Sequence, residues 1–303
     1  MISFPKIQSE IQFLEKKNDI EISILREDQI HAEISGNKFR KLKYNLEAFS
    51  KGNHDALLTF GGAYSNHISA TAAAGKVFGV KTIGIIRGEE LAEKINENPT
   101  LTFAQSCGMH LKFISREQYR NKNSPEFLDK LKSEFGNIYI LPEGGTNELA
   151  VKGCEEILRN HTKDFDFICC PVGTGGTISG LINSAENHQK VLGFPALKDS
   201  DYLVNEINRF TNRSHFELIS DYHFGGYAKV KPELLDFVNG FKAQFDVTLD
   251  AIYTGKMMFG IYDLIENGYF PPKSKILAVH TGGIQGNAGM NQKLKQKNKK
   301  LIV

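Results

Sequence analysis

The sequence contains no apolar run that approaches the roughly 20 residues needed to cross a bilayer. Its N-terminal stretch "MISFPKIQSE" lacks the apolar core of a secretion signal. The formal net charge is only +2, so no global field attracts nucleic acid. From these absences we expect a cytoplasmic protein that binds neither membranes nor nucleic acid.

Metal-binding and disulfide patterns are missing as well. The four cysteines form no CxxC pair and no zinc spacing, and the nine histidines include no HExxH pattern. Cys169 and Cys170 lie in the apolar run "FDFICCPV", where we expect buried thiols rather than ligands or a disulfide. The sequence therefore predicts no metal site.

What is present is the composition of an ordinary soluble protein. The 303 residues are 41% hydrophobic and 24% charged, and this length predicts about two domains. The one basic cluster, "KLKQKNKK" near the C-terminus, is expected to be a solvated tail. From about residue 55, short apolar runs alternate with helical patterns, which predicts parallel sheets covered by helices on both faces. The strand candidates are "DALLTF", "KTIGIIR", "LKFI", "IYIL", "FDFICCPV", "KVLGF", "FELI" and "KILAVH".

Glycine-rich loops follow several of these candidate strands. "ALLTF" runs into "GGAYSNH", "IYIL" into "PEGGTN", "ICCPV" into "GTGGTISG" and "ILAVH" into "TGGIQG". Because ligands of open parallel α/β sheets bind at the carboxyl ends of strands, these loops indicate one cleft built from distant parts of the chain.

A lysine at a helix entrance is the first candidate for chemistry. The stretch "EISGNKFRKLKYNLEAFSKG" predicts a helix that begins near Lys38 and stops at Lys51, after a half-buried strand in "DIEISIL". A cation at a helix N-terminus is unfavourable by ~0.3–1 kcal/mol. A neutral Lys38 amine, prepared by nearby cations to form a Schiff base, would remove that conflict. The alternative is a basic, solvated first turn, which we expect for Arg40, Lys41 and Lys43.

The loop "VGTGGTISG" suits an anion. Its glycines let backbone N–H groups close around the anion, and the helix that follows contributes its positive end. No GK[ST] follows, so it is not a Walker A loop, and a GxGxxG fingerprint from Gly173 fails at Ile178. A small phosphate is our interpretation, with tight strand–helix packing as the alternative. A nucleotide-binding protein would also need an acidic ribose partner about 20 residues further on, where only Asp199 is found.

Polar groups in the other loops complete a set. Ser65, Asn66 and His67 stand at a helix entrance in "GGAYSNHISATAAAG", where N-capping and cofactor contact are both open interpretations. No acidic partner of His67 is obvious, so a Ser-His-Asp triad is not supported. Tyr253 and Tyr227 follow a strand and a Gly-Gly loop, as core residues or as site residues. A Schiff-base lysine, a phosphate cup, polar groups for the ring and tyrosines together fit pyridoxal 5′-phosphate.

Six motifs in order also resemble a known family: "SGNKFRKLKYNL", "GGAYSNHISATAAAG", "PEGGTNELAVKG", "GTGGTISG", "YTGK" and "HTGG". From about Leu25 to Gly286 the sequence is similar to the D-cysteine desulfhydrase and 1-aminocyclopropane-1-carboxylate deaminase family, which belongs to the fold-type II, tryptophan synthase β-like enzymes. This resemblance implies a two-domain, three-layer αβα fold with parallel sheets. It implies a small domain at residues 47–155, inserted in a large pyridoxal-phosphate-binding domain of residues 1–46 plus 156–303, and a homodimer.

The same resemblance assigns roles to individual residues. Lys38 would hold the cofactor and Asn66 would bond its O3′ oxygen. Ser65 would meet the substrate carboxylate or assist proton transfer, with Tyr253 and Tyr227 close to the substrate. The phosphate would be held by Gly173, Thr174, Gly175, Gly176 and Thr177.

The partner of the ring nitrogen separates the branches of the family. The deaminase branch typically has glutamate in "YEGK" and leucine in "HLGG", whereas this sequence has Thr254 and Thr281, as in the desulfhydrase branch. A hydroxyl leaves a weaker electron sink, which suffices to expel a β-thiolate but is poorly suited to opening a cyclopropane ring. We therefore expect a small D-amino acid as substrate. The expected reaction is αβ-elimination from D-cysteine to pyruvate, ammonia and sulfide, with Lys38 removing the Cα proton.

Three alternatives stay open. They are ring opening of 1-aminocyclopropane-1-carboxylate, a D-serine-type ammonia-lyase, and an inactive homologue that only binds the cofactor. Two departures bear on the substrate: Tyr64 replaces the usual glutamine of the family and is expected to narrow the pocket beside Ser65, and the approach "REDQIHAEISGNK" lacks the usual Gly-rich run.

Overall fold

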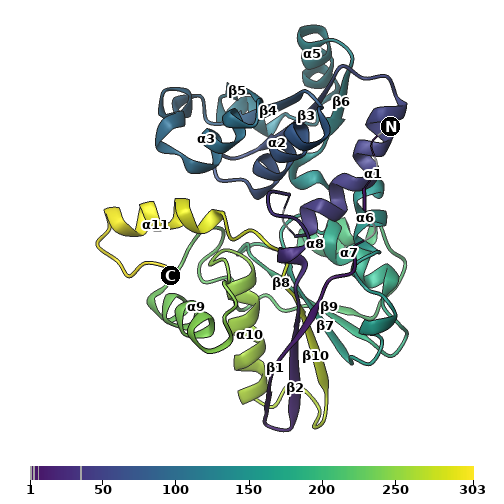
Figure 1. Cartoon of the computed structure of the whole chain (residues 1–303), viewed down its shortest axis with the longest axis vertical. Helices are drawn as coiled ribbons and strands as arrows, with labels where there is room; N and C mark the ends of the chain where they lie inside the picture. The colour runs from purple at the N-terminus through teal and green to yellow at the C-terminus, as the bar shows by residue number, and fades with distance from the viewer. Residues whose placement is uncertain (1, 3, 6, 35) are drawn as a thin grey trace.

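Two β-sheets organise the chain (Figure 1). The computed structural model describes residues 2, 4–5, 7–34 and 36–303, so Ser35 of the "SGNK" motif lies outside the described residues. The larger sheet has six strands in the order β1-β2-β10-β7-β8-β9. Their bounds are Ile11–Lys17, Ile20–Leu25, Lys275–Val279, Phe167–Val172, Lys190–Pro195 and Phe216–Leu218.

The smaller sheet has four strands in the order β5-β4-β3-β6, and every neighbouring pair is parallel. In chain order, β3 to β6 are Ala56–Gly61, Thr82–Arg87, His110–Ile114 and Ile138–Leu141. In Figure 1 this sheet lies at the top of the view and the six-stranded sheet below it, with α1, α6 and α7 near the level where the two meet. The parallel α/β architecture predicted from the sequence is confirmed.

All eight strand candidates form strands, but the larger sheet is not wholly parallel. Strand β1 pairs antiparallel with β2, while the other neighbours in the sheet are parallel. Sequence reasoning missed β1 because its residues, "IQFLEKK", form an edge strand of mixed polarity that is only partly buried. An edge strand of this kind shows no continuous apolar run.

Helices cover both sheets. Helices α1 to α6 are Asn37–Lys51, Asn66–Phe78, Pro99–Ser106, Arg116–Arg120, Pro125–Phe135 and Glu148–Cys154. Helices α7 to α11 are Gly176–Ser184, Tyr202–Asn208, Pro232–Phe245, Thr254–Glu266 and Gly286–Gln296. Short 3-10 segments lie at Glu27–Gln29 (η1), Glu89–Glu97 (η2), Glu143–Gly145 (η3) and Asn160–Thr162 (η4).

The two adjacent cysteines of β7 show why its sequence is continuously apolar. Cys170 packs in the cluster that includes Leu181 of α7, whereas Cys169 packs on the opposite face with Met257 of α10. Both thiols are free and fully buried, as predicted. Strand β2 was expected to be half-buried, but Ser23, on its other face, is buried as well. A strand covered on both sides does not need strict alternation.

Helix α1, which carries Lys38, ends at Lys51 as predicted. The expectation of a solvated first turn is wrong, because Arg40, Lys41 and Lys43 are all buried. The Arg40 guanidinium forks onto the Glu27 carboxylate, with Nε–Oε2 at 3.0 Å and Nη2–Oε1 at 2.9 Å. Removing one partner of such a buried pair costs about 3–5 kcal/mol of unfolding free energy, so the pair fixes α1 firmly against η1.

The basic cluster at the C-terminus is more structured than a solvated tail. Its first residues belong to α11, and the Lys293 ammonium lies 4.1 Å from the ring centre of Tyr64. Beyond the cluster, Ile302 is buried and accepts a 2.8 Å hydrogen bond from Asn291 Nδ2. The end of the chain therefore packs back onto the protein.

The domain division expected at residues 47–155 stays a prediction. The four-stranded sheet lies inside that range, and the boundary at residues 46 and 47 falls inside α1. Among the described residues, none of the helices combines the length and apolar character that a bilayer crossing demands. Within the same ranges, no group of three or more His, Cys, Asp or Glu side chains is arranged to hold a metal ion.

Candidate active site

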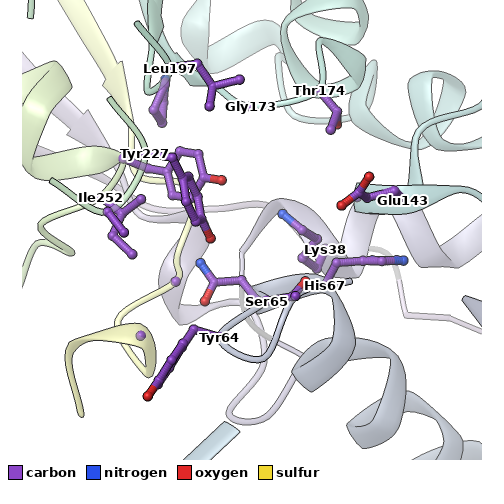
Figure 2. A pocket seen from close by; sticks show the side chains of 18 of the residues that line it. Lys38, Tyr64, Ser65, His67, Glu143, Gly173, Thr174, Leu197, Tyr227 and Ile252 are labelled. Carbon is purple, nitrogen blue, oxygen red and sulfur yellow. The ribbon is translucent and has the colours of Figure 1, made fainter. Parts of the chain in front are cut away.

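One cavity of about 960 Å³ is lined by loops from both sheets. The loops that follow β3 and β6 of the smaller sheet and β7 and β10 of the larger sheet all contribute to it, as predicted from the glycine-rich loops in the sequence. Figure 2 shows the Lys38 amine pointing into this space, with Tyr227 facing it and Glu143 and Thr174 on another side. The carboxyl ends of strands in both sheets thus meet at one site.

The Lys38 amine is tuned toward its neutral form. Enclosure in the cavity wall, with Lys41 as the next contributor, lowers its pKa from 10.5 to about 7. Arg40 and Lys43 point to carboxylates elsewhere, so Lys41 is the one neighbour of the first turn that contributes to this lowering. An amine with a pKa near 7 is a competent nucleophile at neutral pH.

Asn37 holds the amine in place, a role that sequence reasoning missed. Lys38 Nζ donates to Asn37 Oδ1 at 3.0 Å, and Asn37 Nδ2 donates to Thr177 Oγ1 at 2.8 Å. The preceding Gly36 has φ +63°, and a Cβ there would lie 2.0 Å from the carbonyl oxygen of Thr281. Glycine is required at this position, and its close approach joins the start of α1 to the loop after β10.

The loop before α7 forms an anion cup. Gly175 has φ +84° and serves as the N-cap of α7, and no side chain caps the first backbone N–H groups of that helix. A Cβ at Gly176 would lie 3.2 Å from Lys41 Nζ and 2.8 Å from a Thr146 carbon. Gly173, Thr174, Gly175 and Thr177 line the cavity, whereas Gly176 lies just behind it. Free N–H groups, a helix N-terminus and an ammonium favour a dianion at this place.

Lys41 joins the two sides of that cup. Its Nζ donates to the Gly144 carbonyl and to Thr146 Oγ1, both at 3.0 Å, and the hydroxyls of Thr146 and Thr174 lie 2.6 Å apart. The motif "PEGGTN" thereby contributes to the cup through Gly144 and Thr146. An aldehyde-reactive amine beside an uncapped, cationic phosphate cup fits pyridoxal phosphate.

The entrance of α2 also faces the cavity. Ser65 is the N-cap, and its Oγ accepts from Ile68 N–H at 3.3 Å. Asn66 lines the cavity, and its Oδ1 accepts from Gln285 Nε2 at 3.1 Å. Ser65 therefore caps the helix, which confirms the first interpretation, and it also lines the cavity, while its contact with the cofactor stays a prediction.

His67 is a buried neutral side chain. Burial, with the charges of Lys38 and Lys41, holds its pKa well below the usual value. Thr59 Oγ1 donates its proton to the Leu141 carbonyl at 3.0 Å. The same Thr59 oxygen lies 2.8 Å from His67 Nε2, so it must accept from this nitrogen, and Nε2 is the protonated ring nitrogen. His67 Nδ1 is then a buried acceptor with no partner among the described residues.

Of the tyrosines and threonines predicted for the site, three line the cavity and one does not. Tyr253 and Tyr227 line the cavity with their rings edge to face, centroids 6.1 Å apart, and burial holds the pKa of Tyr253 well above 10.0. Thr281 also lines the cavity. Thr254 does not: its hydroxyl donates to buried Asp250 at 2.7 Å, and the same carboxylate accepts the N–H groups that begin α10. The structure therefore places Thr281, and not Thr254, at the cavity wall.

Tyr64 lies at the rim. Figure 2 shows its ring pointing away from Lys38, and a Cβ added at Gly289 would lie 2.4 Å from Tyr64 Cδ1. The ring packs against α11, close to Gly289 and with the Lys293 ammonium of the same helix over its face. The expected narrowing beside Ser65 is therefore at most an effect at the mouth of the cavity.

Lys256, in the motif "YTGK", is a further buried cation that sequence reasoning passed over. Its Nζ donates to the carbonyls of His223 and Gly226 at 2.8 Å and lies 3.5 Å from that of Ala196. Burial lowers its pKa to about 8. The ammonium thus ties down the loop that carries Tyr227. A buried lysine in a motif is a signal that could have been noticed.

Comparison with known proteins decides the family. The family described as "Pyridoxal-phosphate dependent enzyme" matches residues 9–282. The chain belongs to this family. It is an enzyme that depends on pyridoxal phosphate, and the resemblance seen in the motifs is confirmed. It is 32% identical to a Thermotoga maritima protein with a provisional 1-aminocyclopropane-1-carboxylate deaminase name, over 94% of this chain and 96% of that protein.

Other members of the family agree with this placement. An Arabidopsis thaliana mitochondrial protein, named a bifunctional D-cysteine desulfhydrase/1-aminocyclopropane-1-carboxylate deaminase, is 31% identical over 89% of this chain and 74% of its own length. A crystal structure of an ACC deaminase homologue superposes with a TM-score of 0.79 at 27% identity, covering 96% of this chain and 94% of that one. A hydrogen sulfide-producing enzyme from Fusobacterium nucleatum shares the fold at TM-score 0.65 and 15% identity, over 92% and 96% of the two chains.

Proposed function

We propose that this enzyme is a lyase that removes the β-substituent of a small D-amino acid, with D-cysteine as substrate and pyruvate, ammonia and sulfide as products. The observation that carries the proposal is the Lys38 amine, with a pKa of about 7, at the wall of a cavity whose other polar groups include the neutral hydroxyl of Tyr253. This pairing offers one group that takes a proton near neutral pH and one neutral hydroxyl that donates a hydrogen bond to a developing negative charge.

In this proposal the cofactor is held by four sets of groups. The phosphate would be held by Gly173–Thr177 and the α7 N-terminus, near Lys41. Lys38 would hold the aldehyde carbon, Asn66 would meet the ring oxygen and Thr281 would meet the ring nitrogen. The bound cofactor supplies an electron sink for the carbanion at Cα. The protein's own residues orient the substrate and move its protons.

Three residues are assigned to the substrate: Lys38, Ser65 and Tyr253. Lys38 would take the Cα proton as a neutral amine, and Asn37 holds its Nζ in position. Ser65 at the α2 entrance meets the substrate carboxylate, since the helix N-terminus favours an anion there. Tyr253, with Tyr227 beside it, keeps its hydroxyl neutral because of its raised pKa and donates a hydrogen bond to the departing β-group. A donor at the place where negative charge develops stabilises a departing thiolate, so these tyrosines favour elimination.

Hydroxyl chemistry around the ring supports elimination over ring opening. Among the described residues, Glu143 is the only carboxylate lining the cavity, and it lies on the side of the smaller sheet, bonded to Tyr119 and Lys122. Without a carboxylate at Thr281, the ring nitrogen is less protonated and the electron sink is weaker. Expelling a β-thiolate needs less of that sink than breaking a cyclopropane C–C bond.

The test is a substrate screen on the purified holoenzyme. We expect sulfide and pyruvate from D-cysteine, weaker pyruvate release from D-serine, and no 2-oxobutanoate from 1-aminocyclopropane-1-carboxylate. L-Cysteine is the matched control for the facial selectivity of proton removal. Ring opening without sulfide release would reject the proposal, and lack of turnover with every amino acid would favour an inactive cofactor-binding homologue.

A second candidate is 1-aminocyclopropane-1-carboxylate deaminase. It is favoured by the names of the Thermotoga maritima relative and of the crystallised homologue. The same screen decides between the two, because 2-oxobutanoate forms only by ring opening. We also propose that the enzyme acts as a homodimer in the cytoplasm, on the family resemblance. Light scattering on the purified holoenzyme tests the dimer, and a monomer at working concentration would contradict it.

A further inference from the structure

The cavity carries far more positive charge than the chain as a whole. Among the described lining residues, Glu143 is the single acidic side chain, although the net charge of the chain is only +2. The cationic lining residues are Lys38, Lys41, Arg87, Arg116, Arg120, Lys122 and Lys293. Such a cleft concentrates anions at its surface.

Most of these cations already have an assigned partner. Lys38 and Lys41 serve the cofactor site, and Lys293 lies over the Tyr64 ring. Arg116 pairs with Glu90 at 2.7 Å and Lys122 with Glu143 at 3.2 Å. Arg87 and Arg120 remain, and neither forms an ion pair with any described residue.

Arg87 is exposed, and its guanidinium lies near a buried aromatic ring. It is the last residue of β4, after five buried positions, and its guanidinium carbon lies 5.6 Å from the ring centre of Tyr119. Tyr119 is 3% exposed, and its hydroxyl donates to Glu143 at 2.8 Å. A guanidinium on a fixed aromatic ring keeps its N–H edge free for the two oxygens of a carboxylate.

The position of Arg87 is beside the proposed substrate site. A Cβ at Gly62 would lie 3.6 Å from Arg87 Nη2, so the guanidinium lies over the start of the loop that leads to Ser65 and α2. On the facing wall, burial raises the pKa of Tyr227 and the Arg87 charge opposes that rise. An anion between Arg87 and the α2 entrance would face the positive helix end and the guanidinium at once.

We propose that Arg87 binds a carboxylate or similar anionic group of the amino-acid substrate. This inference rests on the proposed function in one respect: the ligand is an amino acid that binds at the cofactor. The anionic group has two sources, the α-carboxylate common to all amino acids and a negative charge on the side chain. Arg87 is then a substrate-binding residue contributed by the smaller sheet.

The experiment measures binding to the holoenzyme by the change in visible absorbance of the cofactor. D-Alanine and D-aspartate are the probes, because both lack a good β-leaving group and they differ by one side-chain carboxylate. We compare wild type with Arg87→Gln, with Arg87→Lys, which keeps the charge but loses the fork, and with Arg209→Gln as the control, because Arg209 is exposed, lies outside the cavity lining and pairs with Glu206. Unchanged absorbance before titration shows that each variant retains the cofactor.

We expect Arg87→Gln to raise the Kd about 10- to 100-fold, as for loss of a charged hydrogen bond, with Arg87→Lys intermediate and Arg209→Gln unchanged. An equal rise for both probes assigns Arg87 to the α-carboxylate, and a rise for D-aspartate alone assigns it to a side-chain anion. A Kd within twofold of wild type for both probes in Arg87→Gln would overturn the inference.

Failure of the proposed function gives a different pattern. An enzyme without D-cysteine turnover whose affinity for D-alanine falls in Arg87→Gln contradicts the elimination and keeps the anion site. An active enzyme whose Arg87→Gln variant binds both probes normally contradicts the anion site alone. If wild type binds neither probe, the anion site is wrong, and the elimination is judged by D-cysteine turnover alone.

Discussion

The cavity has two walls, one from each sheet, and they present different kinds of chemical groups. The wall from the six-stranded sheet presents glycines, free backbone N–H groups and hydroxyls at Gly173–Thr177, Tyr253 and Thr281. The wall from the four-stranded sheet and α4 presents long charged side chains, with Arg87 and Arg120 among them. Backbone groups cannot be exchanged by mutation, whereas side chains can.

This difference teaches how the site divides its work. A group that is the same in every turnover, the phosphate of the cofactor, is suited to the backbone wall, where position is fixed by secondary structure. A group that differs between substrates is suited to the side-chain wall, where one substitution changes the charge. Lys38 lies where the two walls meet: the start of α1 is tied to Thr177 of the larger sheet's wall, and Lys41 of the same helix donates to the Gly144 carbonyl in the loop after β6 of the smaller sheet.

The largest effect is expected at this junction. Lys38→Ala removes the group that takes the Cα proton, and general base catalysis of this kind contributes about 10²- to 10⁴-fold. We expect turnover to fall by at least that factor and the absorbance near 410–430 nm to disappear. The control is Lys43→Ala, whose ammonium points to Glu156. Normal turnover by Lys38→Ala would show that Lys38 does not take the Cα proton and that the junction of the two walls is not the reacting centre.

Matched glycine substitutions compare the two walls directly. Gly176→Ala crowds Thr146 and Lys41 Nζ at 2.8 Å and 3.2 Å, whereas Gly62→Ala makes an ordinary 3.6 Å contact with Arg87. Overpacking costs about 1–3 kcal/mol, or roughly 5- to 150-fold in cofactor affinity. We therefore expect Gly176→Ala to lower cofactor affinity by this amount and Gly62→Ala to leave it nearly unchanged, as measured by reconstitution of the cofactor-free protein. Equal losses in both would show that the walls do not differ.

A substitution of Lys256 tests whether the loop that carries Tyr227 needs the buried Lys256 ammonium to hold its position. Lys256→Met removes the donors to the His223 and Gly226 carbonyls, which frees the loop carrying Tyr227. Because small misplacements at a reacting centre are costly, we expect kcat to fall roughly 10-fold while cofactor absorbance is retained. Lys229→Met, an exposed change in the same loop, is the control. An unchanged kcat would show that Tyr227 needs no such support.

The smallest effect is a shift in titration. In the cofactor-free protein, Lys38 is expected to react with acetic anhydride with a midpoint near pH 7, because only the neutral amine reacts and its pKa is lowered from 10.5 to about 7. Pulse labelling with mass spectrometry measures this against exposed lysines such as Lys229. Lys41→Met should move the midpoint upward, since it removes a positive neighbour. A midpoint near 10 for Lys38 would be contrary to an activated amine.

The same lowered pKa has a consequence for stability. Between pH 7 and 10.5 the unfolded chain binds more protons at Lys38 than the folded chain does. The free energy of unfolding of the cofactor-free protein therefore gains from this residue as pH rises through that range, and loses as pH falls toward 7.

The strands were predictable because their burial is written in local patterns. Runs such as "FICCPV" are apolar at every position because β7 is covered on both faces, and a strand buried on both faces explains such a run. Helix α1 was predictable for the same reason, through its apolar spacing and its stop before Gly52. Strand β1 was not, because an edge strand with polar residues has no such pattern.

The site was predictable as motifs but not as contacts. The sequence indicated Lys38 and the glycine cup, yet it placed Arg40 and Lys43 in solvent because their partners, Glu27 and Glu156, are distant in sequence. Long-range partners of this kind are determined by the packing of elements, which one sequence does not show. Arg87 was not predicted as a site residue for the same reason, because its position over the Tyr119 ring depends on how the elements pack.

One contact also orders the assembly of the enzyme in time. The backbone of Gly36 is pressed against the carbonyl of Thr281, nearly the whole length of the chain away. During synthesis the ribosome must release this late segment before the early lysine has its surroundings. A nascent chain that has not yet released residue 281 therefore lacks this contact at the start of the helix that carries Lys38.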